Sequence, residues 1–256
     1  MYNSNTVESD LVSVIMPSFN SSATIEESIS SVQRQTYKNW ELLITDDCST
    51  DDTVNIIKRY ASNDPRIKFF TNKTNLGAGV SRNNSIAESK GRYIAFLDSD
   101  DIWVEDKLQR QLRFMQDNNI AFCYANYQKI SANGDKGKII VAPSKVNYHE
   151  LLKSNVIGCL TAIYDSSVLG KVFMPEIRKG QDMALWLKIL QKVDYAWCVN
   201  ETLAYYREGH ESLSSNKFKI LSARWGFYRR YLNFNFIKSS YYFSFYFIRA
   251  LLKHKA

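Results

Sequence analysis

The sequence predicts an α/β fold in which a mostly parallel central sheet is flanked by helices. In the first hundred residues, apolar runs of strand length alternate with stretches of helical periodicity. This order is typical of βαβ units, whose right-handed crossovers place helices on both faces of a sheet. A length of 256 residues and a hydrophobic content of 45% supply the core of one large domain.

The first half of the expected domain covers residues 11–102. Its strands are expected at residues 11–16, 41–46, 67–71 and 93–98. The first helix is expected to begin where Thr24 and Glu27 have the spacing of a capping box. Two further helices are expected at residues 53–62 and 80–89.

The second half, residues 103–216, is less regular and is expected to complete the same sheet. Its expected elements are a helix at residues 105–117, a strand at 121–127, a turn at Asn133-Gly134 and a helix at 182–191. Residues 1–10 are expected to be a flexible N-terminus, because they are polar and lack the pattern of a secretory signal. No uncharged apolar segment reaches 18 residues, so no transmembrane helix is expected.

Acidic and aromatic residues follow the expected strands at the points where those strands end. They are Pro17, Phe19 and Asn20 after the first strand, Asp46 and Asp47 after the second, and Asp98, Ser99, Asp100 and Asp101 after the fourth. Ligands of parallel α/β sheets bind beyond the carboxyl ends of the strands. The sequence therefore predicts a binding site at this edge.

Three carboxylates within four residues, at the end of the fourth strand, favour a bound cation. Carboxylate oxygens suit Mg²⁺ or Mn²⁺, and a site with only one or two carboxylates is completed by water and substrate phosphates. The alternative is that these acids cap the helix expected from Glu105. A glycine-containing loop, Asn75 to Gly79, precedes a helix that carries Arg82, and such an arrangement can approach an anion closely.

Several enzyme classes are excluded by what the motifs lack. A dinucleotide-binding dehydrogenase is excluded because the glycines follow the third expected strand and the third glycine of the fingerprint is missing. A Walker P-loop and a G-x-S-x-G elbow are also absent. A sugar-nucleotide pyrophosphorylase would need an early glycine-rich basic loop, whereas residues 17–22 contain neither glycine nor a cation.

An ordered series of motifs resembles the inverting glycosyltransferases with the GT-A fold, often called family 2, which include many bacterial capsule, O-antigen and teichuronic-acid enzymes. The series is VIMPSFN at residues 14–20, QTYKNWE at 35–41, DDCSTD at 46–51, NLG at 75–77 with SRN at 81–83, and LDSDD at 97–101. The resemblance covers about residues 11–217. It implies transfer of a hexose-type sugar from a UDP-sugar, with inversion, to an undecaprenyl-diphosphate-linked acceptor in O-antigen or capsule assembly.

The resemblance also implies roles for individual residues in binding the nucleotide-sugar. Phe19 would stack on the base and Asp47 would bind its edge, while Asp98 and Asp100 would hold ribose and the metal. The same set would include Pro17, Asn20, Asp46 and Ser99. Arg82 would contact the diphosphate or orient the acidic cluster. The alternatives are that Phe19 is a core aromatic and Arg82 a surface ion pair.

The general base implied by the resemblance is Asp182, within Gly180-Gln181-Asp182-Met183-Ala184-Leu185-Trp186. Gln181 stands where the family often has Glu, which leaves a nucleotide-sugar-binding protein without transferase activity as an alternative function. Asp182 could instead be a plain helix N-cap. In a later segment of the resemblance, Arg207 and His210 would approach the diphosphate or the metal.

Residues 217–256 form a basic, aromatic tail with nine Lys and Arg, 13 aromatic residues and no Asp or Glu. Its cations exceed the formal net charge of +7 for the whole chain, so the remainder is slightly acidic. This composition predicts amphipathic helices at the surface of an anionic inner membrane, with the enzyme peripheral on the cytoplasmic face. An oligomerisation helix and a flap packed on the domain are the alternatives. Nucleic-acid binding lacks a recognition motif.

Overall fold

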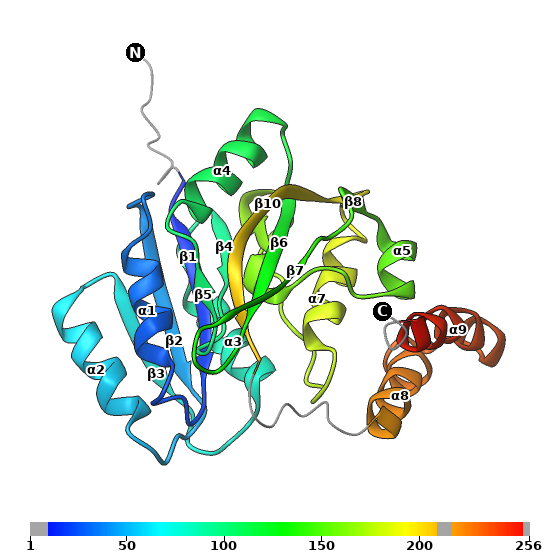
Figure 1. Cartoon of the computed structure of the whole chain (residues 1–256), viewed down its shortest axis with the longest axis horizontal. Coiled ribbons are helices and arrows are strands. Elements are labelled where there is room, and N and C mark those ends of the chain that lie inside the picture. Colours follow the sequence, from blue (N-terminus) through cyan, green and yellow to red (C-terminus); the bar gives the residue numbers. More distant parts are fainter. Residues whose placement is uncertain (1–9, 209–216, 253–256) are drawn as a thin grey trace.

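The computed structural model of the chain describes residues 10–208 and 217–252, and in these ranges a ten-stranded sheet lies between layers of helices (Figure 1). The strand order is β3-β2-β1-β4-β9-β6-β10-β5, with β7 paired to β6 and β8 paired to β10. The predicted α/β fold is confirmed.

The first half of the sheet is parallel, as expected. Its strands are β1 (Val12–Ser18), β2 (Trp40–Asp46), β3 (Ile67–Thr71) and β4 (Tyr93–Phe96). The helices between them are α1 (Ile25–Gln33), α2 (Thr53–Asn63) and α3 (Ala78–Glu88). The chain steps outward from β1 to β3 and then returns to place β4 on the other side of β1. This reversal creates a crevice at the carboxyl ends of β1 and β4, where ligands of such sheets bind.

The second half of the sheet is mixed rather than mostly parallel. Its elements are β5 (Ile102–Trp103), α4 (Lys107–Asp117), β6 (Phe122–Ile130), β7 (Lys136–Ile140), β8 (Lys145–Val146), α5 (Tyr148–Lys153), β9 (Ile163–Asp165), α6 (Ser166–Leu169), α7 (Gln181–Ile189) and β10 (Ala196–Arg207). Among the described strand pairs of this half, β6 and β10 are parallel and the others are antiparallel. Antiparallel pairing needs only a short turn, and the expected turn at Gly134, with φ of +88°, joins β6 to β7.

Residues that alternate along β1 supply two cores, one on each face of the sheet. Val14 and Met16 pack with α1, α2 and α4, whereas Ile15 packs with α3 and α7. On the second face, the ring centroid of Trp186 in α7 lies 5.3 Å from that of Phe96 and 5.3 Å from that of Phe122. This packing holds the start of α7 beside the end of β4.

The tail packs one of its faces on the domain, as one of the alternatives predicted. It consists of α8 (Lys217–Gly226), a π-helical turn (Phe227–Tyr231) and α9 (Phe236–Leu252), at the right of Figure 1. Tyr228 is fully buried and donates a hydrogen bond of 2.6 Å to the Leu152 carbonyl, and the Tyr242 hydroxyl lies 3.0 Å from His149 Nδ1. These contacts attach the π-helical turn and α9 to α5.

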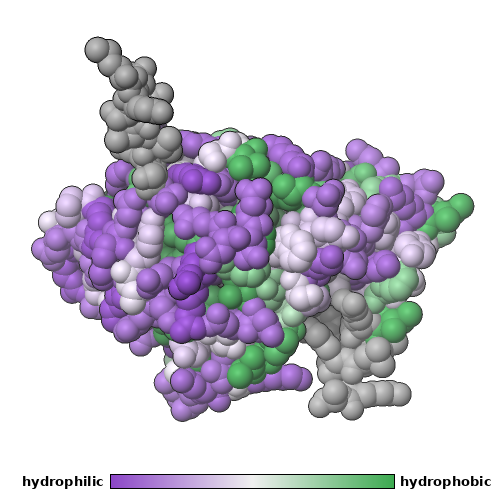
Figure 2. Space-filling model, turned by 90° about the horizontal axis from the view of Figure 1, so that it is seen from above, coloured by the Kyte–Doolittle hydropathy of each residue, from purple (hydrophilic) through white to green (hydrophobic). Residues whose placement is uncertain are grey.

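The opposite face of α9 exposes large apolar side chains. The α9 outer face comprises Phe236, Ile237, Tyr241, Phe247 and Ile248, which are between 43% and 79% exposed. Figure 2 shows hydrophobic surface at this end of the molecule. None of the helices in the described residues has the length and apolarity of a membrane span.

We expect Lys107→Met to stabilise the fold. Lys107 is fully buried, its Nζ has no hydrogen-bond partner in residues 10–208 and 217–252, and it lies 3.9 Å from the ring centroid of Trp103. Desolvation lowers the pKa of Lys107 to about 7, from an ordinary value of 10.5. The exchange should raise the free energy of unfolding at pH 7 by about 1–3 kcal/mol, the cost of an unsatisfied buried group.

The pH dependence of the free energy of unfolding tests whether the buried charge of Lys107 is the cause of the expected gain. Between pH 7 and 10.5 the unfolded chain binds one more proton at Lys107 than the folded chain, so the wild-type free energy of unfolding rises with pH. The advantage of Lys107→Met should therefore be largest below pH 7 and shrink towards pH 10, as measured by urea unfolding. Lys58→Met, at an exposed position of α2, is the control. An advantage that does not change with pH would contradict the explanation.

Candidate active site

A cleft of about 910 Å³ opens beyond the carboxyl ends of β1 and β4, and the end of β10 closes its far side. Most of the expected nucleotide-sugar residues line it. Its lining includes Pro17, Phe19, Asn20, Asp47, Arg82, Asp98, Ser99, Asp100 and Arg207. Residues distant in the sequence thus meet at the predicted edge of the sheet.

The segment after β1 presents an aromatic ring to this cleft. Phe19 is 47% exposed, which rules out the alternative of a core aromatic. The turn is held by Asn20, which has a positive φ of 46° and whose Oδ1 accepts a hydrogen bond of 2.8 Å from the Thr50 amide. A half-exposed ring on a fixed turn is suited to stacking against a planar base.

The two acids after β2, Asp46 and Asp47, have different roles. Asp46 is buried and does not line the cleft, because its carboxylate accepts from Ser18 at 3.0 Å and from the Ser49 amide at 2.8 Å. Asp47 lines the cleft and accepts from the amides of Leu76 and Gly77 at 2.8 and 2.6 Å. Asp46 therefore fixes the turn that follows β2, and Asp47 fastens the glycine loop to the wall of the cleft.

Arg82 lies at the centre of the charged side chains at the cleft. It is buried, which rules out a surface ion pair, and its guanidinium pairs with Asp98. Desolvation acts to lower the pKa of Arg82, but attraction to Asp98, Cys159 and Asp182 outweighs it and raises the pKa. Arg82 Nε has no partner among the described residues. This nitrogen is itself buried, so it is an unsatisfied donor within the wall of the cleft.

The other acids of the cluster carry more negative charge than Arg82 neutralises. Asp100 lies at the cleft surface, where desolvation by the walls and repulsion from Asp98 raise its pKa to about 6. Asp101 is buried, and desolvation with repulsion from Asp100 raises its pKa. Asp101 accepts from the Arg207 amide at 3.0 Å, so it holds β10 against the cluster. The alternative role as caps of α4 is not observed, since α4 begins only at Lys107.

The expected capping box at α1 is wrong. The hydroxyl of Thr24 donates to the Ser99 carbonyl at 2.9 Å instead of capping the helix. Glu27 pairs with Arg207 rather than with the start of its own helix. Both side chains therefore make long-range contacts instead of capping the helix. These contacts join α1 to the acidic segment and to the end of β10.

Arg207 lines the cleft, but protein groups surround its guanidinium. It donates to the carbonyls of Asp100 at 3.0 Å and Ala132 at 2.9 Å, in addition to the pair with Glu27. Its contact with a diphosphate therefore remains a prediction. His210 lies outside the described residues. Next to Arg207, Tyr206 faces the cleft with 38% of its surface exposed, a position that the sequence did not single out.

Asp182 lies in the first turn of α7 and is not a helix N-cap, since the cap residue is Gly180. Its Oδ2 accepts from Asn155 Nδ2 at 2.8 Å, while the buried Asn155 Oδ1 has no partner among the described residues. Asp182 does not line the cleft, but it is near enough to Arg82 to raise the pKa of that residue. Asn155 had no sequence signal, because it approaches Asp182 only in the folded chain.

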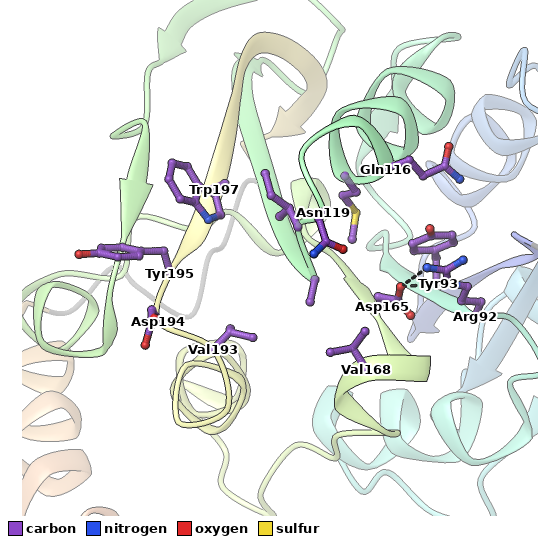
Figure 3. A pocket seen from close by; sticks show the side chains of 13 residues that line it. Arg92, Tyr93, Gln116, Asn119, Asp165, Val168, Val193, Asp194, Tyr195 and Trp197 are labelled. Carbon is purple, nitrogen blue, oxygen red and sulfur yellow. Dashed lines mark hydrogen bonds and ion pairs between the residues drawn. The ribbon is translucent and has the colours of Figure 1, made fainter.

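A second hollow of about 590 Å³ lies at the opposite edge of the sheet, beside the amino end of β4 (Figure 3). Arg92 in this hollow already forms an ion pair of 2.7 Å with Asp165. Trp197 and Tyr195 line its other side, and Lys145 lies over both rings. This hollow is remote from the carboxyl ends of the strands, so the first cleft is the candidate active site.

Comparisons with known proteins agree with this geometry. The family model described as Glycosyl transferase family 2 matches residues 13–169. TuaG of Bacillus subtilis, named for teichuronic acid biosynthesis, is 43% identical over 91% of this chain and 93% of its own. WfgD of Escherichia coli, named as a UDP-Glc:alpha-D-GlcNAc-diphosphoundecaprenol beta-1,3-glucosyltransferase, is 43% identical over 95% of both chains.

A solved structure shares the fold. Residues 1–349 of S. aureus TarS, in complex with UDP-GlcNAc, superpose with a TM-score of 0.69 at 20% identity. The likeness covers 86% of this chain and 66% of that chain, so this chain spans slightly less than two thirds of the TarS structure. At this identity the likeness concerns the fold, and it confirms the GT-A architecture expected from the order of the motifs.

Proposed function

The chain belongs to glycosyl transferase family 2, and we propose that it transfers a hexose-type sugar from a UDP-sugar, with inversion, to a lipid-linked saccharide in bacterial surface polysaccharide assembly. One observation carries the proposal. Phe19, Asp47, Arg82, Asp98 and Asp100 converge on one cleft at the point where the strand order reverses.

The donor would lie across this cleft. The ring of Phe19 is available to stack on uracil, beside the loop that Asp47 fastens. Arg82 lines the cleft and is placed to donate to an oxygen of the diphosphate. The names of TuaG and WfgD support an acceptor of the surface-polysaccharide type, and the name of WfgD supports a diphosphoundecaprenol carrier.

The transfer would need one proton acceptor and no covalent enzyme intermediate. The acceptor hydroxyl oxygen would attack the anomeric carbon from the side opposite the diphosphate, and its proton would pass to Asp182 as general base. The bond between that carbon and the diphosphate oxygen breaks, and UDP leaves. Asn155, which donates to Asp182 Oδ2, would hold the base in orientation.

Asp98 and Asp100 would hold Mn²⁺ or Mg²⁺, which supplies positive charge to the leaving diphosphate. Crowded carboxylates that Arg82 only partly neutralises fit such an ion. Among residues 10–208 and 217–252, no three His, Cys, Asp or Glu side chains form a metal-binding group. An ion can be held by two carboxylates when phosphate oxygens and water complete its coordination.

The experiment is a panel of UDP-glucose, UDP-galactose and UDP-N-acetylglucosamine with Mn²⁺ or EDTA, in which UDP release and calorimetric UDP binding are measured. Metal-dependent UDP release from one donor is the expected result. UDP binding without release, even when a lipid-linked saccharide is present, would favour the nucleotide-sugar-binding alternative. Absence of UDP binding would reject the assignment of the cleft.

We further propose that the α9 outer face lies on the cytoplasmic side of an anionic inner membrane, where the lipid carrier is anchored. Exchanging Ile237 and Ile248 together for Glu should lower the recovery of the chain with anionic vesicles by about tenfold or more, since each buried Ile contributes about 1.5–3 kcal/mol. Flotation at low and high salt measures this recovery. The control exchanges Val141 and Val168, exposed elsewhere, for Glu. Equal recovery of both double variants would reject membrane binding by α9.

A further inference from the structure

A groove of about 560 Å³ separates the loop before α7 from the tail. This tail groove is formed by two segments that are distant in the sequence. Its lining residues are Ile177, Arg178, Lys179, Ala223, Gly226, Phe227, Arg230 and Tyr231. The proposed donor site does not include any of them.

The lining of the tail groove combines three cations with an aromatic wall. Among residues 10–208 and 217–252, no acid lines the groove, and neither Arg178 nor Arg230 forms an ion pair with a carboxylate. The rings of Phe227 and Tyr231 pack against each other with centroids 5.2 Å apart. A surface of this kind is complementary to a ligand with an anionic head and an apolar chain.

The groove adjoins the candidate active site. A Cβ on Gly77 would lie 3.3 Å from Arg178 Nη1, so Arg178 lies directly over the loop that Asp47 holds at the donor cleft. Asp182 follows Arg178 by four residues, a separation of at most about 14 Å even for an extended chain. A sugar joined to an anion in the groove could therefore reach the proposed base.

Arg230 is packed so that its charge faces the groove. A Cβ on Gly226 would lie 2.7 Å from Arg230 Nη2, so the guanidinium rests against the helix backbone at this position. Any larger residue at 226 would displace Arg230. The neighbouring Arg229 is also exposed, but it does not line the groove and instead donates to the Phe234 carbonyl.

We propose that the tail groove binds the diphosphate of the lipid-linked acceptor, with Arg178, Lys179 and Arg230 on the phosphates and with Phe227 and Tyr231 beside the first part of the lipid chain. The proposal rests on the proposed function, and it locates the acceptor's carrier. It also gives the tail a second purpose, since its π-helical turn forms one wall of a substrate site. The bond formed in the reaction is unchanged, because the groove only positions the acceptor.

The test uses the full chain with bound UDP and three probes, namely farnesyl diphosphate, farnesyl monophosphate and farnesol, in calorimetric titrations. The wild type should bind the diphosphate most tightly. Arg230→Glu should weaken diphosphate binding by ~10-fold or more, the size expected for loss of a charge-assisted contact. Arg229→Glu, which changes the charge of the tail equally, should stay within about twofold of the wild type.

A second variant distinguishes an effect on binding in the groove from an effect on folding. Gly226→Ala favours the helix and should keep the melting temperature, yet it should weaken diphosphate binding because it displaces Arg230. Equal weakening by Arg229→Glu and Arg230→Glu would mean that general tail charge attracts the probe, and this would overturn the proposal. Equal binding of the three probes would also overturn it. If the wild type does not bind UDP, the assignment of the donor site is rejected instead. Failure of the groove proposal and failure of the proposed function are therefore distinguishable.

Discussion

Asp182→Asn should reduce sugar transfer by about 10²–10⁴-fold and leave UDP binding unchanged. A positioned general base contributes this range to a rate, and the amide cannot accept the proton of the acceptor hydroxyl. UDP affinity should persist because Asp182 does not line the donor cleft. The exchange is nearly isosteric, so the contact with Asn155 and the packing of α7 should survive.

The measurement is a comparison of kcat for transfer with the Kd for UDP in the same preparation. Glu176→Gln is the matched control, because it removes an exposed acid from the loop that precedes α7 and should leave both quantities unchanged. Asn155→Ala should lower kcat by a smaller factor, since it frees the orientation of Asp182 without removing the base. Full turnover of Asp182→Asn would assign the proton to another group.

Much of the parallel half of the fold was predictable because β1, β2 and β4 are buried along their whole length. Such strands appear as nearly continuous apolar runs. The edge strand β3, in which only Ile67 is buried, also has the predicted bounds of residues 67–71. The irregular half was less predictable. β9 has three residues and β5 has two, so their places depend on pairing with β4, β6 and β10 rather than on any local pattern.

The candidate site divides in a similar way. Residues that directly follow buried strands, such as Phe19, Asp47 and Asp100, lie at the cleft as predicted. Thr24 was predicted to cap its own helix, because its spacing to Glu27 is a local signal. In the structure, Thr24 instead contacts the Ser99 carbonyl and Glu27 pairs with Arg207. Nothing local could show this, since their partners lie 75 and 180 residues away along the chain.

The tail shows why composition predicts less than geometry. Its basic and aromatic character predicted helices, and helices are present in the described part. Composition alone could not show which aromatics would pack inward, such as Tyr228 and Tyr242, and which would remain outside. Burial of one face leaves the other available to a membrane, so the packed flap and the membrane surface are not exclusive alternatives.

Arg82→Met should abolish transfer and also destabilise the fold by about 3–5 kcal/mol, the cost of breaking a buried ion pair by removing one partner. Without Arg82, the Asp98 carboxylate would lose its ion-pair partner beside Asp100 and Asp101, and Arg207 would be left as the neighbouring cation. The same exchange at Arg59, whose pair with Glu26 is exposed, should cost less than about 1 kcal/mol. Urea unfolding measures both values.

A double exchange separates the stability of the cluster from its chemistry. Adding Asp98→Asn to Arg82→Met removes the unpaired charge, so most of the lost free energy of unfolding should return. Transfer should not return, because the proposed donor contact of Arg82 and the proposed metal ligand Asp98 would then both be missing. Recovery of stability without activity would show that Arg82 neutralises the acids in the free enzyme and that the pair of Arg82 and Asp98 is needed for transfer as well as for folding. A single Arg82→Met variant as stable as the wild type would show that the acids do not need this cation to fold.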